Sequence, residues 1–259
     1  MDLKKDEVFY SRLEDLKRCA IRGNLGISAF FSPREIFLAQ EYLKRGGVEF
    51  LFFGGYDDAE RKKCYLLPEF IGEIQNIGDI CEYGYSLEVD AVLVKGSGFE
   101  KLSHRAIMGS VLGLGVQRDV IGDIVLINDN EAVFFCDSQL TDFFEDNLER
   151  IGRDKVKLCR IGLDKLELPS KSFLQISDTV ASARLDCIVS ALCSLSRERA
   201  KEKIEGSLVE LNFELEERPD KEVAVPAIIS VRGVGKFQVV SVSDKTKKGR
   251  YRLLAKKYL

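Results

Sequence analysis

Residues 183–212 read ARLDCIVSALCSLSRERAKEKIEGSLVELN and set the architecture of the C-terminal part of the chain. Apolar residues recur in the first half of this segment at positions i, i+3, i+4 and i+7. That spacing predicts a helix with one buried stripe and one face in water. The residues of the stripe are Leu185, Ile188, Val189 and Leu192.

A second helix is predicted directly after the first. Ser196 is a suitable N-cap, and Gly206 can end the helix in a left-handed conformation. Ala200 and Ile204 lie on its inner side. Its outward cations form pairs four residues apart, so each pair lies on one side of the helix; the pairs are Arg197 with Lys201, and Arg199 with Lys203. Alternation of Val209, Leu211 and Phe213 then predicts a strand.

This pattern resembles the S4-type RNA-binding domain. Ten residues match that family in order and spacing: Arg184, Leu185, Asp186, Ser196, Arg197, Ala200, Ile204, Gly206, Val209 and Asn212. The sequence departs from the family at two turns, with Phe213 in place of a usual glycine and Pro226-Ala227 in place of Gly-Asp. The resemblance implies an alpha-L fold that binds RNA. We expect Asp186 to orient Arg184 by a charge-assisted hydrogen bond.

Charge is distributed unevenly along the 259 residues. The net charge is −3, but from Ser182 onward 16 Lys and Arg stand against 11 Asp and Glu, a balance of +5. The preceding residues have 23 Lys and Arg against 31 Asp and Glu, a balance of −8. A basic C-terminal module after an acidic body indicates a localised surface for a polyanion.

The end of the chain extends this basic character. Seven cations and no acid lie within Lys245–Lys257, with Tyr251 among them and Tyr258 directly after them. Counterion release from phosphates would make binding to such a surface strongly salt-dependent. The alternative is a solvated terminal strand with basic ends. A strand and glycine turn predicted at 228–236 are expected to extend the same surface. The predicted RNA contacts are Arg184, Ser196, Arg197, Arg199, Lys201, Lys203, Asn212, Arg232, Lys236, Lys245, Lys247, Lys248 and Arg250.

The seven cysteines form no CxxC pair and no cluster with histidine, so neither a zinc site nor a disulfide framework is indicated. We expect no cofactor, because the sequence has neither the dinucleotide fingerprint nor a phosphate-binding Gly-Lys-Ser/Thr. A scattered odd number of cysteines without a signal peptide is typical of a reducing cytosol. No segment approaches the roughly 20 apolar residues of a membrane span. A hydrophobic fraction of 45% and a charged fraction of 31% are typical of a globular protein. These features predict a soluble, cytoplasmic protein.

Residues 1–75 are predicted to form an N-terminal α/β subdomain. Its opening amphipathic helix has apolar positions at Val8, Leu13, Leu16 and Ile21. Ser32-Pro33-Arg34-Glu35 then supplies an N-cap, a proline at the first helical position and a glutamate at N3, which predicts a helix to about Arg45. Gly46-Gly47 stops that helix, and residues 48–53 are predicted to form a buried strand.

Residues 76–170 are predicted to form a ferredoxin-like domain, with 71–86 largely a connection. The order is strand, helix, strand, strand, helix, strand, at 88–95, 103–113, 123–127, 131–136, 138–151 and 155–161. The aromatic signature of RNA-recognition sheets is absent from the third strand, so an RRM-like shape is predicted without base binding by its sheet. Phe134 and Phe135 point to opposite faces, so at least one is expected in the core. The C-terminal domain is assigned to 181–259, and the whole is of the α+β class.

Further groups of residues match one bacterial family. They are Phe31-Ser32-Pro33-Arg34-Glu35, Gly54-Gly55-Tyr56 followed by Ala59-Glu60-Arg61, Ser103-His104-Arg105 with Gly109, and Leu112-Gly113-Leu114-Gly115 through Arg118 to Ile121-Gly122-Asp123. These residues resemble the YlmH family, and with the C-terminal motif the similarity spans nearly the whole chain. Ser32 stands where relatives usually carry aspartate, and both residues can cap a helix.

The YlmH resemblance implies an RNA-binding, ribosome-associated protein. Members of the family are connected with cell division and with stalled large ribosomal subunits that still hold peptidyl-tRNA. The expected partners are therefore structured rRNA or tRNA and the large ribosomal subunit, without DNA. The acidic front domains are expected to set position or recruit partners.

Two sites in the front domains allow more than one interpretation. His104, the only histidine, lies beside Arg105 at a helix start where Ser103 is a suitable N-cap; it could serve as a general base, contact RNA or be structural. Asp57 and Asp58 follow a glycine turn and could bind a metal, although a strand-ending turn in which Asp57 caps a short helix is the simpler interpretation. Secondary RNA contacts are expected at His104, Arg105, Arg61 and Lys62, and Lys63 could also touch phosphate.

Two other classes of function stay open at this point. An RNA-modifying enzyme of the pseudouridine synthase or methyltransferase type would need a larger catalytic domain or a glycine-rich cofactor loop, and the sequence shows neither. A protein-interaction adaptor in cell division would use the acidic domains, with the basic tail serving solubility only. We therefore predict no catalytic residue.

Overall fold

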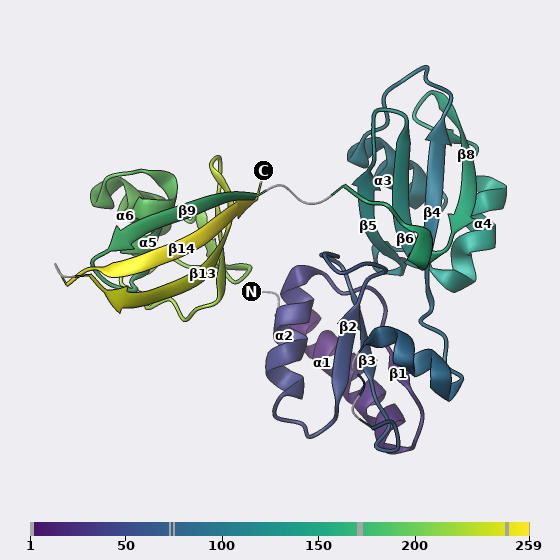
Figure 1. Cartoon of the computed structure of the whole chain (residues 1–259), viewed down its shortest axis with the longest axis horizontal. Helices are drawn as coiled ribbons and strands as arrows, with labels where there is room; N and C mark the ends of the chain where they lie inside the picture. Colours follow the sequence, from purple (N-terminus) through teal and green to yellow (C-terminus); the bar gives the residue numbers. More distant parts are fainter. Residues whose placement is uncertain (1–2, 73, 75, 170–172, 247–248, 259) are drawn as a thin grey trace. The chain divides into compact units, whose positions relative to one another are not determined.

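The computed structural model describes residues 3–72, 74, 76–169, 173–246 and 249–258. It divides into two compact units, Met1–Pro169 and Ser170–Leu259 (Figure 1). Helices and sheets occur in both units, in agreement with the predicted α+β class. In the described residues, no helix is both long and apolar enough to cross a membrane. The division of the first unit into two domains at residue 75 stays a prediction.

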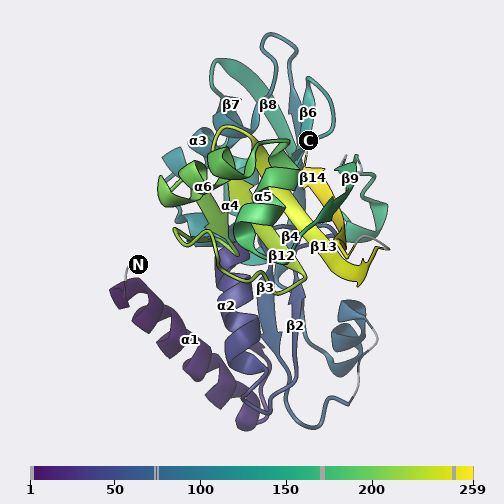
Figure 2. The same cartoon turned by 90° about the vertical axis from the view of Figure 1, so that its left-hand side faces the viewer.

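The N-terminal part of the first unit is a small sheet with two helices on one face (Figure 2). Its strands pair antiparallel in the order β1-β3-β2. The 3-10 helix η1, Ile77–Tyr83, packs its buried Ile80 against the other face. The remaining elements are α1 Leu3–Ile21, β1 Gly26–Ile27, α2 Pro33–Leu43, β2 Phe50–Phe53 and β3 Lys63–Leu66.

Local signals predicted the second helix more accurately than the first. The capping box of α2 is formed as predicted, with the Glu35 carboxylate accepting from the Ser32 backbone N–H at 2.7 Å. In α1, however, two predicted inward residues are exposed: Val8 by 54% and Ile21 by 70%. The predicted Leu13 is fully buried and Leu16 packs against the same core, whereas the other buried positions are Phe9 and Ala20, which the prediction did not include. The predicted strand at 48–53 is confirmed as β2, but it is only half-buried, and the fully buried strand is β3.

The rest of the first unit is a five-stranded antiparallel sheet in the order β5-β6-β4-β8-β7. The predicted succession of strands and helices is present, with α3 capped by Ser103. Two 3-10 turns precede β5 and α4, and a third follows β8. The elements are β4 Val89–Gly96, α3 His104–Gly113, η2 Arg118–Val120, β5 Ile121–Leu126, β6 Glu131–Asp137, η3 Ser138–Leu140, α4 Thr141–Asn147, β7 Arg150–Ile151, β8 Asp154–Ile161 and η4 Leu163–Lys165.

The helix predicted over 138–151 is too long. Its first residues form η3, the α-helix spans only Thr141–Asn147, and residues 150–151 form the strand β7. The chain leaves the helix at Leu148, whose side chain is buried in the core. Gly152 then adopts a φ of 61°, which allows the tight turn from β7 into β8.

Both faces of the five-stranded sheet are covered. Phe134 packs edge-on against Phe144 of α4, with ring centroids 5.5 Å apart. On the other face, Phe135 stacks on Tyr56 of the N-terminal part at 5.0 Å, and Phe30 packs beside it. Both phenylalanines are therefore core residues. Since the chain itself occupies both faces, this sheet presents no open platform on which bases could stack.

The Gly54-Gly55-Tyr56 turn joins the two sheets of the first unit. The Tyr56 hydroxyl donates to Asp123 of β5 at 2.9 Å, and the same carboxylate accepts from the backbone N–H of Arg61 at 3.0 Å. Gly55 has a φ of +101°, and a Cβ there would lie 2.2 Å from the Phe135 ring. The turn is confirmed, but Asp57 caps no helix, because the chain continues directly into β3 through a bend.

We expect Gly55→Ala to lower the free energy of unfolding of the first unit by about 3 kcal/mol, because it combines left-handed strain with overlap on Phe135. Thermal unfolding followed by circular dichroism would measure the loss. Gly109→Ala is the matched control, since a Cβ at this helical position meets nothing within 4 Å and should be neutral or stabilising. Equal unfolding temperatures for both variants would contradict the assigned role of the turn.

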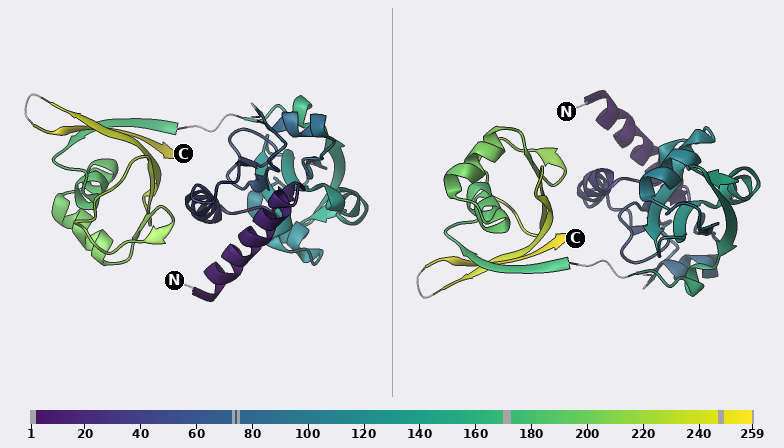
Figure 3. Two further views of the ribbon diagram at one scale, coloured as in Figure 1. Left: turned by 90° about the horizontal axis from the view of Figure 1, so that it is seen from below. Right: turned by 90° about the horizontal axis from the view of Figure 1, so that it is seen from above.

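The C-terminal unit is a six-stranded antiparallel sheet with a helix pair on one face (Figure 3). The strand order is β11-β10-β12-β13-β14-β9. The predicted apolar stripe is confirmed, since Leu185, Ile188 and Val189 are fully buried against the sheet. The elements are β9 Phe173–Val180, α5 Leu185–Cys193, α6 Arg197–Glu205, β10 Val209–Leu211, β11 Glu214–Leu215, β12 Ala227–Val231, β13 Gly235–Lys245 and β14 Tyr251–Tyr258.

Two details of the predicted helix–strand junction are wrong. Gly206 has a φ of −83°, and the left-handed residue after α6 is Ser207, with a φ of 54°. The strand β10 ends at Leu211, because Asn212 and Phe213 have φ angles of 49° and 69°. The second angle explains why glycine is the usual residue at the position of Phe213 in the motif.

Candidate nucleic-acid interface

A buried carboxylate organises the helix pair of the C-terminal unit. Asp186, in the first turn of α5, has an exposed fraction of 0%. Arg184 donates to it at 3.2 and 3.3 Å, as predicted, and Arg197 at the start of α6 donates at 2.9 and 3.0 Å. The Cys187 backbone N–H supplies a further bond at 2.8 Å. Asp186 therefore fixes two guanidinium groups from different elements.

The protonation of Asp186 follows from these bonds. Burial raises the pKa of the carboxyl, but the hydrogen bonds from Arg184 and Arg197 outweigh burial, so the net pKa is lowered from its ordinary value. The carboxylate is thus ionised at neutral pH. Two guanidiniums around one carboxylate leave a net positive charge, and both arginine side chains remain partly exposed, by 40% and 46%.

The helix α6 presents the other predicted cations. Arg199 and Lys201 are exposed and Lys203 is half-buried, while Ala200 and Ile204 are fully buried on the inner side. The helix therefore has the orientation that its sequence predicts. Ser196 caps it, since the hydroxyl accepts from the Arg199 backbone N–H at 3.3 Å. That acceptor already serves the fold, so Ser196 is better described as a helix cap than as a contact residue.

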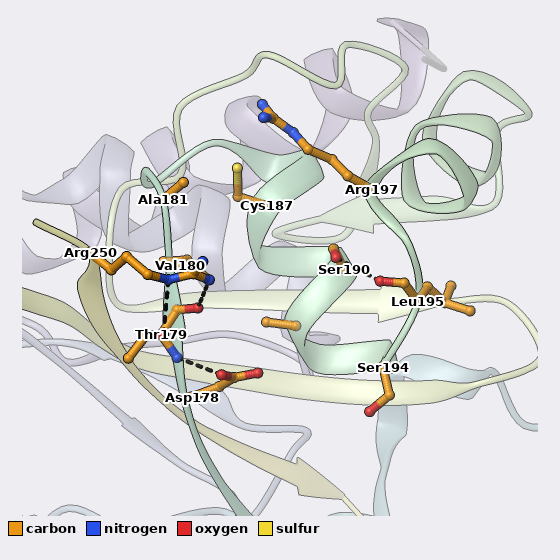
Figure 4. Close-up of a pocket in the computed structure, with 11 residues that line it drawn as sticks. Asp178, Thr179, Val180, Ala181, Cys187, Ser190, Ser194, Leu195, Arg197 and Arg250 are labelled. Atoms are coloured by element: carbon orange, nitrogen blue, oxygen red, sulfur yellow. Dashed lines mark hydrogen bonds between the residues drawn. The ribbon is translucent and has the colours of Figure 1, made fainter. Parts of the chain in front are cut away.

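A hollow of about 560 Å³ lies between β9 and α5 (Figure 4). Arg197 and Arg250 both line it, together with Thr179, Ser190, Ser194 and the acidic Asp178. Arg250 is held in place, because its guanidinium donates to the Thr179 hydroxyl at 3.0 Å and to the Thr179 carbonyl at 2.6 Å. Guanidinium and hydroxyl groups around a hollow can bind an anionic group by hydrogen bonds and charge, although the Asp178 carboxylate opposes an anion here.

The structure does not bring all the predicted contacts onto one surface. Asn212 is structural, because its side-chain oxygen accepts from the Ile228 backbone N–H at 2.9 Å. Arg232 is exposed in the turn between β12 and β13. Lys236 lies on the opposite face of the sheet from the helices, because its neighbour Phe237 points into the helix-side core. The expectation that 228–236 would extend the same surface is therefore wrong for Lys236.

The structure describes only part of the basic segment before β14. Lys247 and Lys248 lie outside the described residues, and for Lys245 only the backbone is described. Their predicted RNA contacts stay predictions. Neither the partner of Arg250 nor the second arginine on Asp186 could be predicted from the sequence, because both pairs join residues that only the tertiary fold brings together.

The side chains expected to make secondary RNA contacts in the first unit differ in whether they are free to reach RNA. His104 and Arg105 are exposed at the start of α3, and Arg105 lines a shallow hollow with Ser110 and Gly152. Arg61 instead serves the junction of the two sheets, where its guanidinium donates to the carbonyl oxygens of Phe30 at 2.8 Å and Ile121 at 2.9 Å. The expectation of an RNA contact at Arg61 is thus contradicted by its hydrogen bonds.

The two lysines after Arg61 also differ from each other. Lys62 donates to the Asp57 carbonyl at 3.3 Å. Lys63 is almost fully buried and forms an ion pair with Asp137 at 2.6 Å, so it is not available to phosphate. Among the residues that the structure describes, no group of three or more His, Cys, Asp or Glu is placed to hold a metal ion.

We expect Asp186→Asn to lower the stability of the C-terminal unit by about 2 kcal/mol at pH 7, because it removes the acceptor charge for two arginines. A lowered pKa in the folded state gives stability that is present above the unfolded pKa, near 4, and is lost as the pH falls through the folded value. The deficit of the variant should therefore shrink below about pH 4.

Hydrogen exchange of the α5 amides would measure that deficit locally. Asp220→Asn, which changes an exposed carboxylate of the same unit, is the control and should behave like the parent chain. If the stability deficit of Asp186→Asn does not change with pH, the conclusion that Asp186 is ionised in the parent chain is contradicted.

Comparisons with known proteins address the chain more broadly. Residues 75–165 match the family described as "Putative RNA-binding domain in YlmH". The chain is 29% identical over 253 residues to "Ribosome-associated protein quality control protein P2" of Bacillus subtilis (strain 168), with 96% of this chain and 95% of the relative covered.

One solved structure is similar in fold. "Cell division protein ylmH from Streptococcus pneumoniae" has a TM-score of 0.51 and 21% identity, covering 63% of this chain and 95% of that chain. At this identity the likeness concerns the fold alone. The chain is thus similar to an RNA-binding domain of YlmH over residues 75–165 and to a ribosome-associated protein over most of its length.

Proposed function

We propose that the protein binds structured ribosomal RNA or tRNA through its C-terminal unit and associates with the large ribosomal subunit in the cytoplasm. The name of the Bacillus subtilis relative supports a role in ribosome-associated quality control, and stalled peptidyl-tRNA complexes are the proposed object of that role. The name of the similar Streptococcus pneumoniae protein supports a link to cell division. The match over residues 75–165 supports RNA as the ligand.

The observation that carries the proposal is the arginine pair on Asp186. Arg184 and Arg197 are fixed by a buried carboxylate and still expose part of their guanidinium groups. Oriented guanidiniums bind phosphate through two parallel hydrogen bonds and lose little entropy when they do so. Arg199 and Lys201 add exposed charge on α6, the helix that begins with Arg197.

An S4-type assignment of the C-terminal unit is part of the proposal. The motif residues Ala200, Ile204 and Val209 are fully buried between the helix pair and the sheet, which explains their spacing. Folded RNA presents its shape and backbone to such a platform, so affinity should depend on charge and geometry more than on base sequence.

An RRM-like assignment of the five-stranded domain is also proposed. The order β5-β6-β4-β8 is the antiparallel arrangement expected of a βαββαβ unit. Since Phe134 and Phe135 are both covered, any RNA contact of this domain would use its loops and helices. The exposed His104 and Arg105 at the start of α3 are the proposed contacts.

Several observations favour binding over catalysis. Burial raises the pKa of the Cys136 thiol to about 12 and also raises that of Cys64, which disfavours the reactive thiolates. Asp186 is engaged by two arginines, so it is poorly placed to act as an acid or base. We therefore propose a non-enzymatic role.

We expect Arg199→Glu with Lys203→Glu to weaken binding of tRNA and of large ribosomal subunits by at least about tenfold at moderate salt, because two cations are removed and two anions added. The salt slope of log K should fall by about 2, one for each lost phosphate contact. Filter binding over a salt series and co-sedimentation would measure these effects. Arg197 is left unchanged because its loss would also disturb Asp186.

The matched control reverses two neighbouring exposed cations of the first unit, Lys44→Glu with Arg45→Glu. This variant has the same change in net charge and should bind nearly as the parent chain does. Unchanged RNA affinity in the α6 variant, or equal losses in both variants, would refute the proposed interface. Ribosome association that persists after RNA digestion would point to a protein partner instead.

A further inference from the structure

The sheet of the C-terminal unit has one covered and one open face. Residues that alternate toward α5 and α6 are nearly completely buried, among them Ile229, Phe237 and Ala255. Their neighbours along the same strands point the other way and are half-buried or exposed. In the described part of this unit, both helices lie on the first face (Figure 3).

Aromatic rings and lysines alternate across the open face. Tyr258 of β14 lies opposite Phe173 of β9, and their rings meet edge-on at 5.1 Å. The Lys236 ammonium lies 4.9 Å from the centroid of the Tyr258 ring and 5.6 Å from that of Phe213. We call Phe213, Lys236, Tyr258 and Phe173 the aromatic row. Lys256 lies beside the row, 5.5 Å from the Phe173 centroid.

Positive charge predominates around the aromatic row. Leu253 and Ala255 of β14 point into the core, so the outward positions of this strand are Arg252, Leu254, Lys256 and Tyr258. None of the outward side chains that the structure describes in β9, β12, β13 and β14 is acidic. Glu210 shares this face, but it lies on β10, two strands away from Lys236. The face is therefore complementary to an anionic chain whose units carry flat apolar groups.

We propose that this open face binds unpaired RNA nucleotides, with bases on the rings of Phe173, Tyr258 and Phe213 and phosphates beside Lys236, Lys256 and Arg252. Aromatic rings that interleave with cations are the combination by which proteins hold single strands. The proposal rests on RNA binding as the proposed function and adds a second site, on the face opposite α5 and α6.

Unpaired nucleotides suit this face better than a duplex does. Bases within a duplex are already stacked on each other, so their flat faces cannot reach a protein ring. Phe173 is 37% exposed and Tyr258 is half-buried, so both rings are partly accessible at the surface. The five-stranded sheet of the first unit lacks such a platform because Tyr56 stacks on its Phe135. Base stacking, which the sheet performs in RNA-recognition domains, is thus proposed here for the sheet of the C-terminal unit.

The test uses the full-length chain and two labelled RNAs, a single strand of about 10 nucleotides and a stem-loop closed by a tetraloop. Phe173→Ala with Tyr258→Ala should weaken binding of the single strand by about tenfold or more, since stacking is worth about 1–3 kcal/mol per base. Phe173→Tyr with Tyr258→Phe keeps both rings and should bind as the parent chain does. Phe99→Ala removes a ring that is 75% exposed in the first unit and is the control for loss of any surface aromatic.

The double variant of α6 distinguishes a failure of this proposal from a failure of the proposed function. Arg199→Glu with Lys203→Glu should weaken the stem-loop more than the single strand, whereas the ring deletions should do the reverse. If the ring deletions leave single-strand affinity unchanged, the stacking site is refuted while the helix interface stands. If neither RNA binds the parent chain, both proposals fail. If ring deletion instead abolishes capture of a protein partner and leaves both RNAs bound, the face is a protein-docking surface and the proposal is overturned.

Discussion

The electrostatic organisation of the C-terminal unit depends on one buried carboxylate. Asp186 has no exposure to water and would destabilise the fold if it were unpaired, because an isolated buried charge loses its hydration. Arg184 and Arg197 offset that loss, and in doing so they are fixed at the junction of α5 and α6. The same interaction therefore holds the helix pair together and orients the cations that the proposed RNA contact requires.

In the first unit, a cluster of polar groups stabilises the fold and does not present its arginine to a ligand. Asp123 accepts from Tyr56 and from the backbone of Glu60 and Arg61, and the Arg61 guanidinium donates to the carbonyl oxygens of Phe30, in the loop after β1, and of Ile121 in β5. Burial lowers the pKa of this guanidinium, although Asp123 and other nearby carboxylates oppose the shift. Residues that look like a functional motif in the sequence thus hold two sheets together.

The two larger sheets differ in what covers them, and this difference sets what each can bind. The five-stranded sheet has helices on one face and the N-terminal part of the chain on the other, so Phe134 and Phe135 are both core residues. In the residues that the structure describes, the six-stranded sheet has helices on one face only, and the rings of Phe173 and Tyr258 are partly exposed. An aromatic residue in a strand indicates base stacking only when the face that it occupies stays open.

Features that depend on neighbouring residues could be predicted from the sequence alone. The caps at Ser32, Ser103 and Ser196, the buried stripe of α5 and the basic C-terminal module all follow from local hydrogen bonds, periodicity and composition. Which cations are accessible to a ligand became clear only from the folded chain, because accessibility depends on contacts between residues far apart in the sequence. Arg61 and Lys63 are engaged in such contacts, Lys236 is turned to the far face by strand parity, and Arg197 gains a partner eleven positions before it. Pairing across the fold leaves no periodic pattern in the sequence, so no local rule could have found it.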